Sequence, residues 1–144
     1  MFPAVVVSIA ISMVVSDVAF APEYKKAEGT WTVTAMVMNG EEIPADAYKD
    51  MRMVLKDRTV SAYSGKDVIA QGSYRIVGTK AKQVRFDLLM GAGTDKGKTF
   101  LALNEWVDAD TIRTCLAQPG KERPTTVETE KGDRRAMFVI KRVK

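Results

Sequence analysis

The sequence contains no histidine and a single cysteine, Cys115. Without histidine there is no Ser-His-Asp or Cys-His catalysis, no histidine-ligated zinc and no imidazole pH switch. One cysteine permits neither a disulfide within the chain nor a four-cysteine metal site. The sequence also offers no matching set of base, nucleophile and metal ligands. We therefore predict that the protein is not an enzyme and that it requires no metal or cofactor.

An excess of one charge is also lacking. Lysine and arginine together number 22 and aspartate and glutamate 18, which gives a net charge of +4. The two signs are interspersed over most of the chain, as on a solvated surface. The basic residues at the C-terminus flank residues 136–140, which have the pattern of a buried strand. Nucleic-acid binding needs a dense basic face with aromatic side chains for stacking, so no nucleic-acid partner is expected.

The longest hydrophobic run, residues 2–15, is too short for a membrane-spanning helix, which needs about 20 apolar residues. Its length suits the hydrophobic core of a signal peptide, and a small-x-small pattern ends at Ala21. However, no basic residue precedes the run, and Pro22 would follow the cut. An uncleaved anchor and a buried strand are the alternatives. We expect residues 1–21 to direct export or to associate with a membrane, and residues 22–144 to form the domain; a cytoplasmic location stays open.

The remaining chain alternates turn signals with short segments rich in β-branched and aromatic residues, which predicts an all-β fold. Only residues 45–50 have a helical pattern, and residues 121–133 form a long polar connection with room for a short strand at 125–129. Eight strands are expected, near residues 29–38, 51–56, 59–64, 67–77, 83–90, 98–107, 110–117 and 134–143.

Each expected strand has one apolar face, the pattern of antiparallel sheets with one buried and one solvated side. In the first strand, for example, Trp31, Val33, Ala35 and Val37 are expected to share the buried face. Eight sequential antiparallel strands can close on themselves and so remove their exposed edges. The predicted fold is an eight-stranded antiparallel up-and-down barrel, whose interior is either filled by side chains or holds one small ligand.

The first strand opens with Gly29-Thr30-Trp31, a G-x-W that resembles the lipocalin signature. In lipocalins the tryptophan closes the bottom of the barrel, and a basic residue on the last strand packs across it. The resemblance implies that Trp31 has this closing role and that Arg142 is its basic partner, with Lys141 as the second candidate.

Further stretches, in matching order over residues 25–144, resemble the uncharacterised lipocalin-like domain family of calycin-type barrels that is expanded in planctomycete bacteria. These stretches are residues 29–31, 39–44, 95–99, 110–117, 119–124 and 141–144. The resemblance implies a lipocalin-like barrel, often exported, and it brings no reaction, ligand or catalytic residue. The chain departs from the family at Asn104-Glu105-Trp106, where aliphatic and aromatic residues are usual.

This departure supplies candidate ligand-binding residues. Neighbouring residues of a strand point to opposite faces, so either Asn104 or Glu105 lies among apolar neighbours. A buried polar group needs a partner, from the protein or from a ligand. Trp31 forms either the floor of a ligand cavity or a plug of the core. The candidate set is Trp31, Tyr74, Arg85, Asn104, Glu105 and Trp106.

The leading functional hypothesis is non-catalytic binding of a small apolar or amphipathic molecule outside the cytoplasm. The alternative is a protein-interaction module with a solid barrel, whose partner meets loops 91–98 and 119–124, because loops often carry function. The volume of the barrel interior distinguishes the two hypotheses, since a core filled by large aromatic side chains leaves no cavity.

Overall fold

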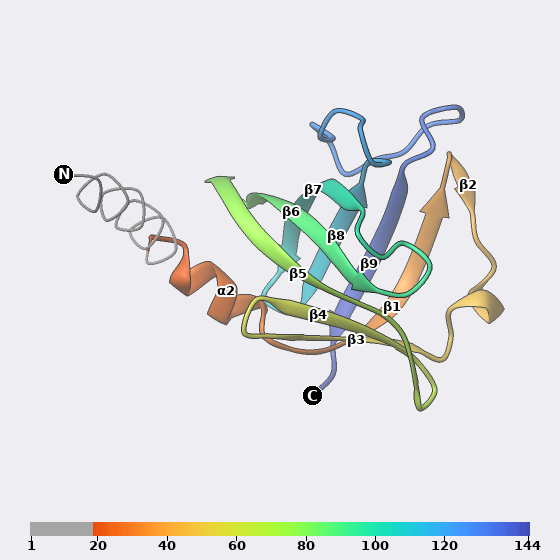
Figure 1. Cartoon of the computed structure of the whole chain (residues 1–144), viewed down its shortest axis with the longest axis horizontal. Helices are drawn as coiled ribbons and strands as arrows, with labels where there is room; N and C mark the ends of the chain where they lie inside the picture. The colour runs from red at the N-terminus through yellow and green to blue at the C-terminus, as the bar shows by residue number, and fades with distance from the viewer. Residues whose placement is uncertain (1–18) are drawn as a thin grey trace.

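The computed structural model describes residues 19–144, so the hydrophobic run of residues 2–15 lies outside the described residues. Figure 1 shows a short helix leading into a strongly curved sheet. The described elements are α2 (Ala21–Ala27), β1 (Gly29–Met38), β2 (Glu41–Glu42), the 3-10 helix η1 (Ala45–Ala47), β3 (Met51–Lys56), β4 (Thr59–Ser64), β5 (Asp67–Lys80), β6 (Gln83–Ala92), β7 (Thr99–Asp108), β8 (Thr111–Leu116) and β9 (Ala136–Arg142).

The sheet closes into a barrel. Every strand pairs antiparallel with the next in the order β1-β3-β4-β5-β6-β7-β8-β9, and β9 pairs back with β1. The closing register brings Trp31 opposite Arg142 at one end and Met38 opposite Ala136 at the other. β2 lies outside this ring and forms a short hairpin with the end of β1. The predicted all-β, eight-stranded antiparallel up-and-down barrel is therefore confirmed.

Two local features are now defined. The helical pattern of residues 45–50, which has room for no more than a turn or two, forms the 3-10 turn η1, and the short strand for which residues 125–129 left room does not form. In that second segment, Val127 is buried against Leu103 and Cys115 on the outer face of the barrel. The segment is thus held by side-chain burial rather than by a backbone ladder, which strand propensity does not anticipate.

The apolar face of β1 also differs from the prediction. The register of β1 against β9 shifts between Val33 and Ala35, which marks a β-bulge. A bulge adds one residue to a strand and reverses the alternation beyond it. Trp31 and Val33 are in the core as expected, but Met36 continues the core face in place of Ala35. The expectation that Val37 also shares this face is wrong for the same reason.

Helix α2 packs against one end of the barrel, and Phe20, Tyr24 and Ala27 contact the core. The expected boundary between residues 21 and 22 therefore lies within α2, and α2 itself packs on the barrel. Among residues 19–144, no helix has both the length and the apolar character needed to cross a bilayer.

Candidate functional site

Helix α2 and two tryptophans close one end of the barrel, which we call the closed end. Trp31 is completely buried there, and its indole Nε1–H donates to the carbonyl of Ala27 at 3.0 Å. The last carbonyls of a helix have no partner within the helix. The Trp31 indole is the hydrogen-bond donor for one of these carbonyls. The buried ring therefore fills the closed end of the barrel, and its N–H also holds α2 against it.

Arg142 completes the closed end. Its guanidinium carbon lies 4.3 Å from the centroid of the Trp31 ring, and its Nη1 and Nη2 donate to the carbonyls of Glu28 at 2.6 Å and Lys26 at 2.8 Å. Its Nε also pairs with Asp110 at 3.1 Å. The planar guanidinium suits this combination of stacking and several fixed hydrogen bonds. Arg142 thus packs across Trp31 and joins the last strand to the end of α2.

Gly29 has to be glycine at this junction. Its φ is +140°, a backbone conformation that side-chain-bearing residues rarely adopt. A Cβ at this position would also lie 3.0 Å from Nη1 of Arg142. The glycine of the G-x-W therefore leaves room for the guanidinium over Trp31.

An aromatic layer continues from the closed end into the interior. The Trp31 and Trp106 rings lie 6.2 Å apart, and the Lys26 ammonium lies 4.1 Å from the Trp106 ring centroid. Tyr24 of α2 contacts Tyr74 of β5 with ring centroids 5.4 Å apart, and its hydroxyl oxygen accepts the N–H of Ile76 at 2.7 Å. These contacts fill this end of the barrel with packed aromatic side chains.

Above this layer the barrel contains a partly open cavity of about 70 Å³. A polar pair lies in its wall: the Thr114 hydroxyl donates to Oδ1 of Asn104 at 2.6 Å. All other lining side chains are apolar or aromatic. The lining is Met53, Leu55, Val60, Tyr74, Phe86, Leu88, Asn104, Thr114, Leu116, Phe138 and Ile140. Burial raises the pKa of the Tyr74 hydroxyl well above its usual value, so Tyr74 is a neutral group in this cavity.

The barrel wall separates the six predicted site residues. Tyr74 and Asn104 line the cavity, whereas Trp31 and Trp106 belong to the buried core at the closed end and do not line it. Arg85 is exposed on the outer surface, beside Arg123, and Glu105 lies in an outer cleft with Arg113. Candidate residues on the outer surface cannot orient a molecule inside the barrel.

Thr114 is the polar residue that the candidate set missed. It lies between Ile112 and Leu116 on the inward face of β8, so its position was visible as a polar residue on an apolar face. Its cross-strand pairing with Asn104 was not visible, because strand register is a long-range property. Among the described residues, every buried side-chain nitrogen or oxygen has a hydrogen-bond partner.

A second apolar cluster lies on the outside of the barrel, under the long connection between β8 and β9. Leu103, Cys115 and Val127 are buried together there. Arg123 fastens the connection to the wall: its Nη1 donates to the carbonyls of Phe86 and Ala102, and its Nη2 pairs with Asp87. The loop at residues 119–124 is therefore packed against the barrel rather than free to adapt.

Cys115 is expected to resist labelling by thiol reagents in the folded protein. The side chain has no exposed surface, and burial raises the pKa of the thiol to about 11 from 9.0. This shift lowers the thiolate fraction about 100-fold at neutral pH, and the thiolate is the reactive form. Labelling should be fast only in denaturant. Rapid labelling of the folded protein would contradict the described burial.

The same shift predicts a pH dependence of stability. Because the folded state favours the neutral thiol, its contribution is complete below pH 9.0 and is lost as the pH rises toward about 11. The free energy of unfolding of the wild type should fall more steeply over this window than that of Cys115→Ala. Equal slopes in urea titrations would contradict the prediction.

The described part of the chain holds no group of three or more Cys, Asp or Glu side chains placed to bind a metal ion. The candidate features are the closed end, the small interior cavity with its polar pair, and the outer cleft that holds Glu105 and Arg113. No protein-family model, curated protein or solved structure matches this chain, so its functional assignment depends on the geometry above.

Proposed function

We propose that the protein is a lipocalin-like domain that binds a small apolar or amphipathic molecule inside its barrel, without catalysis and outside the cytoplasm. The observation that carries this proposal is the Asn104–Thr114 pair in an otherwise apolar cavity above the packed closed end. Ligand sites of this kind combine an apolar lining with a few polar groups that fix orientation. We also propose that the chain is a member of the lipocalin-like family that it resembles, and that residues 1–21 direct its export or associate with a membrane.

The size of the cavity limits the ligand. Pockets for drug-sized molecules span about 300–1,000 Å³, whereas this cavity measures about 70 Å³. A ligand larger than a few water molecules therefore has to displace lining side chains. Met53, Leu88 and Phe138 are the candidates because they line the cavity and are only partly buried. Methionine has an unbranched, flexible side chain that adapts readily to a new neighbour.

The test is a titration of the full chain with ANS and with saturated fatty acids of increasing length, followed by tryptophan and ANS fluorescence. We expect saturable binding of short-chain acids. Val60→Phe places a ring in the cavity and should weaken binding at least about tenfold, which corresponds to about 1.4 kcal/mol. Val68→Phe makes the same chemical change at a side chain that is 51% exposed, and should leave binding unchanged. Equal effects of the two variants, or no saturable binding, would contradict the proposal.

The small cavity volume also favours a second candidate, a protein-interaction module with a nearly solid barrel. Of the two loops that this hypothesis names, residues 119–124 are held by Arg123 and by buried Pro124. The β6–β7 loop at residues 91–98 is mostly exposed and is stabilised by a Lys98–Asp95 ion pair at 3.2 Å. A partner would therefore dock mainly on the β6–β7 loop. Absence of small-molecule binding by a cooperatively folded barrel is the result expected for this candidate.

A further inference from the structure

A broad concavity lies on the outside of the barrel, at the closed end. It has a volume of about 640 Å³ and lies where β5, β6, β7 and β8 reach that end. Its lining includes three cations, Lys80, Lys82 and Arg113, and one carboxylate, Glu105. We call these three cations and their surroundings the basic cleft.

The cations of the basic cleft are not neutralised within the described chain. The ion pairs formed by residues 19–144 involve other side chains, and none includes Lys80, Lys82 or Arg113. Arg113 and Glu105 are opposite each other in the β7–β8 register, yet they do not form an ion pair. Several cations at one concave surface create a positive potential that attracts an anionic partner.

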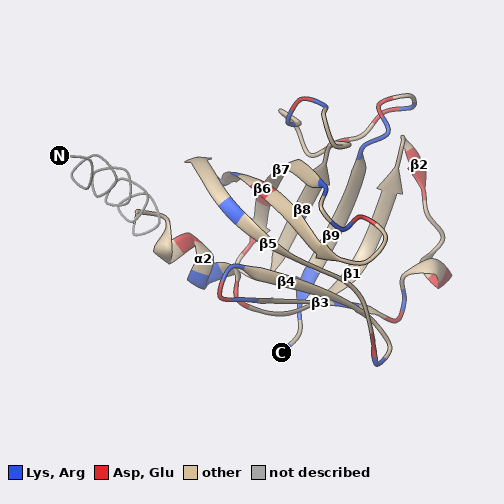
Figure 2. Cartoon of the chain, in the orientation of Figure 1, with Lys and Arg blue, Asp and Glu red and all other residues tan. Residues whose placement is uncertain are grey.

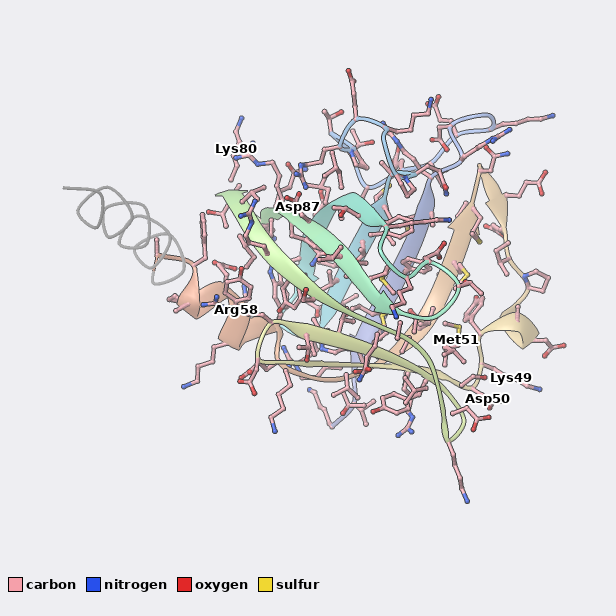
Figure 3. All side chains as sticks on the ribbon, viewed as in Figure 1. Lys49, Asp50, Met51, Arg58, Lys80 and Asp87 are labelled. Carbon is pink, nitrogen blue, oxygen red and sulfur yellow. The ribbon has the colours of Figure 1, made fainter. Side chains whose placement is uncertain are left out.

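Helix α2 adds to this surface. Lys26 of α2 lies over Trp106, and Trp106 is one wall of the basic cleft. Figure 2 shows the basic residues of α2 beside the closed end, and Figure 1 shows α2 on the same side of the barrel as the end of β5. In Figure 3, Arg58 and Lys80 lie toward α2, whereas Lys49, Asp50 and Met51 lie on the opposite side. Lys80 of the cleft and the helix thus lie on the same side of the barrel.

The cleft also exposes apolar surface. Val107 lines the cleft and is 43% exposed. Lysine side chains beside an exposed apolar residue match a membrane interface, where the aliphatic stem is buried and the ammonium reaches the headgroups. Sites for single-stranded nucleic acid instead combine a basic groove with exposed aromatic rings on which the bases stack. The one aromatic ring of the cleft, Trp106, is buried, which favours a bilayer over a nucleic acid.

We propose that the basic cleft docks on the surface of an anionic phospholipid bilayer, with Lys80, Lys82 and Arg113 contacting lipid phosphates. The chain order supports this occupant, because only the five residues 16–20 separate the apolar run of residues 2–15 from α2, and Lys26 of α2 lies over Trp106 of the cleft. Stable attachment to a membrane takes two signals, such as an apolar segment and a basic surface. The barrel then binds with its closed end toward the membrane. This inference does not depend on a ligand inside the barrel.

The experiment compares sedimentation of the full chain with vesicles of pure phosphatidylcholine and with vesicles of equal parts phosphatidylcholine and phosphatidylglycerol. The triple variant Lys80→Gln, Lys82→Gln, Arg113→Gln removes the proposed contacts. Each basic residue near an anionic surface contributes about fivefold to partitioning. We expect the triple variant to lose at least about tenfold of its partitioning to anionic vesicles and to keep its partitioning to pure phosphatidylcholine.

The matched control removes the same charge from the opposite end, where Lys66, Lys96 and Lys131 are exposed. The variant Lys66→Gln, Lys96→Gln, Lys131→Gln should bind anionic vesicles like the wild type. Equal losses in the two triple variants would show an effect of net charge alone and would overturn the proposal. The absence of any loss in the first variant would overturn it as well.

A second measurement leaves the charged residues of the basic cleft unchanged. An environment-sensitive dye is attached at Val107→Cys and, for comparison, at Val68→Cys. Both positions are exposed; Val107 is near the end of β7, at the closed end of the barrel, and Val68 is near the start of β5, at the opposite end. Buried Cys115 should stay unlabelled. Anionic vesicles should shift the emission of the dye at position 107 to the blue and leave the dye at position 68 unchanged. The reverse pattern, or a shift at position 107 with soluble polyphosphate but not with vesicles, would overturn bilayer docking.

Discussion

Replacing Trp31 with alanine is expected to lower the free energy of unfolding by about 3–5 kcal/mol, the usual range for a fully buried tryptophan. The side chain is completely buried and contacts Trp106, α2 and Arg142 together. Its removal leaves a cavity at the closed end and takes away the hydrogen-bond donor of the Ala27 carbonyl. Equilibrium urea unfolding followed by far-ultraviolet circular dichroism measures the change.

Trp31→Phe is the matched control for this prediction. Phenylalanine keeps an aromatic ring but has no N–H, so the Ala27 carbonyl loses its donor while much of the packing remains. We expect a smaller loss, about 1–3 kcal/mol, from the unpaired carbonyl and the reduced volume. If the two variants were equally stable, the packing of the ring would contribute nothing, and our account of the closed end would be incorrect.

Replacing Arg142 with alanine is expected to have the next largest effect, about 2–3 kcal/mol. The guanidinium is a charged donor to the carbonyls of Glu28 and Lys26, and hydrogen bonds to charged groups contribute about 1.5–3 kcal/mol. Only 23% of the side chain is exposed, so water replaces these contacts incompletely. The same urea titration measures the loss, and α2 should become more accessible to proteolysis because two of its attachments are gone.

Two variants control for charge and for shape. Lys141→Ala removes a neighbouring positive charge from an exposed side chain, and should change the free energy of unfolding by no more than about 0.5 kcal/mol. Arg142→Lys keeps the charge but loses the planar fork, so it should recover only part of the stability. A loss in Lys141→Ala as large as that in Arg142→Ala would assign the effect to charge rather than to the contacts of the guanidinium.

The candidate site was predictable only in part. Asn104 was singled out because a polar residue interrupts an apolar face, and the structure places it in the cavity wall. Arg85 and Glu105 were included for their polarity, yet both lie outside. The basic cleft was not predicted, because Lys80 and Lys82, at the β5–β6 turn, join Arg113 of β8 only through the pairing of the strands between them. Local pattern shows that a residue is unusual, but the partners across the sheet decide what it contacts.

The eight barrel strands and their sequential order were predictable from the sequence, because alternation of period two and tight turns are local properties. β3, for example, was expected at residues 51–56 and occupies Met51–Lys56. The short strand β2 was not predicted. Two features were decided by tertiary structure alone. One is the bulge in β1, which places Met36 rather than Ala35 on the core face, and the other is the burial of Val127 on the outer wall of the barrel. The physical reason is that bulges, cavity volume and loop docking depend on packing between distant segments, which no local pattern encodes.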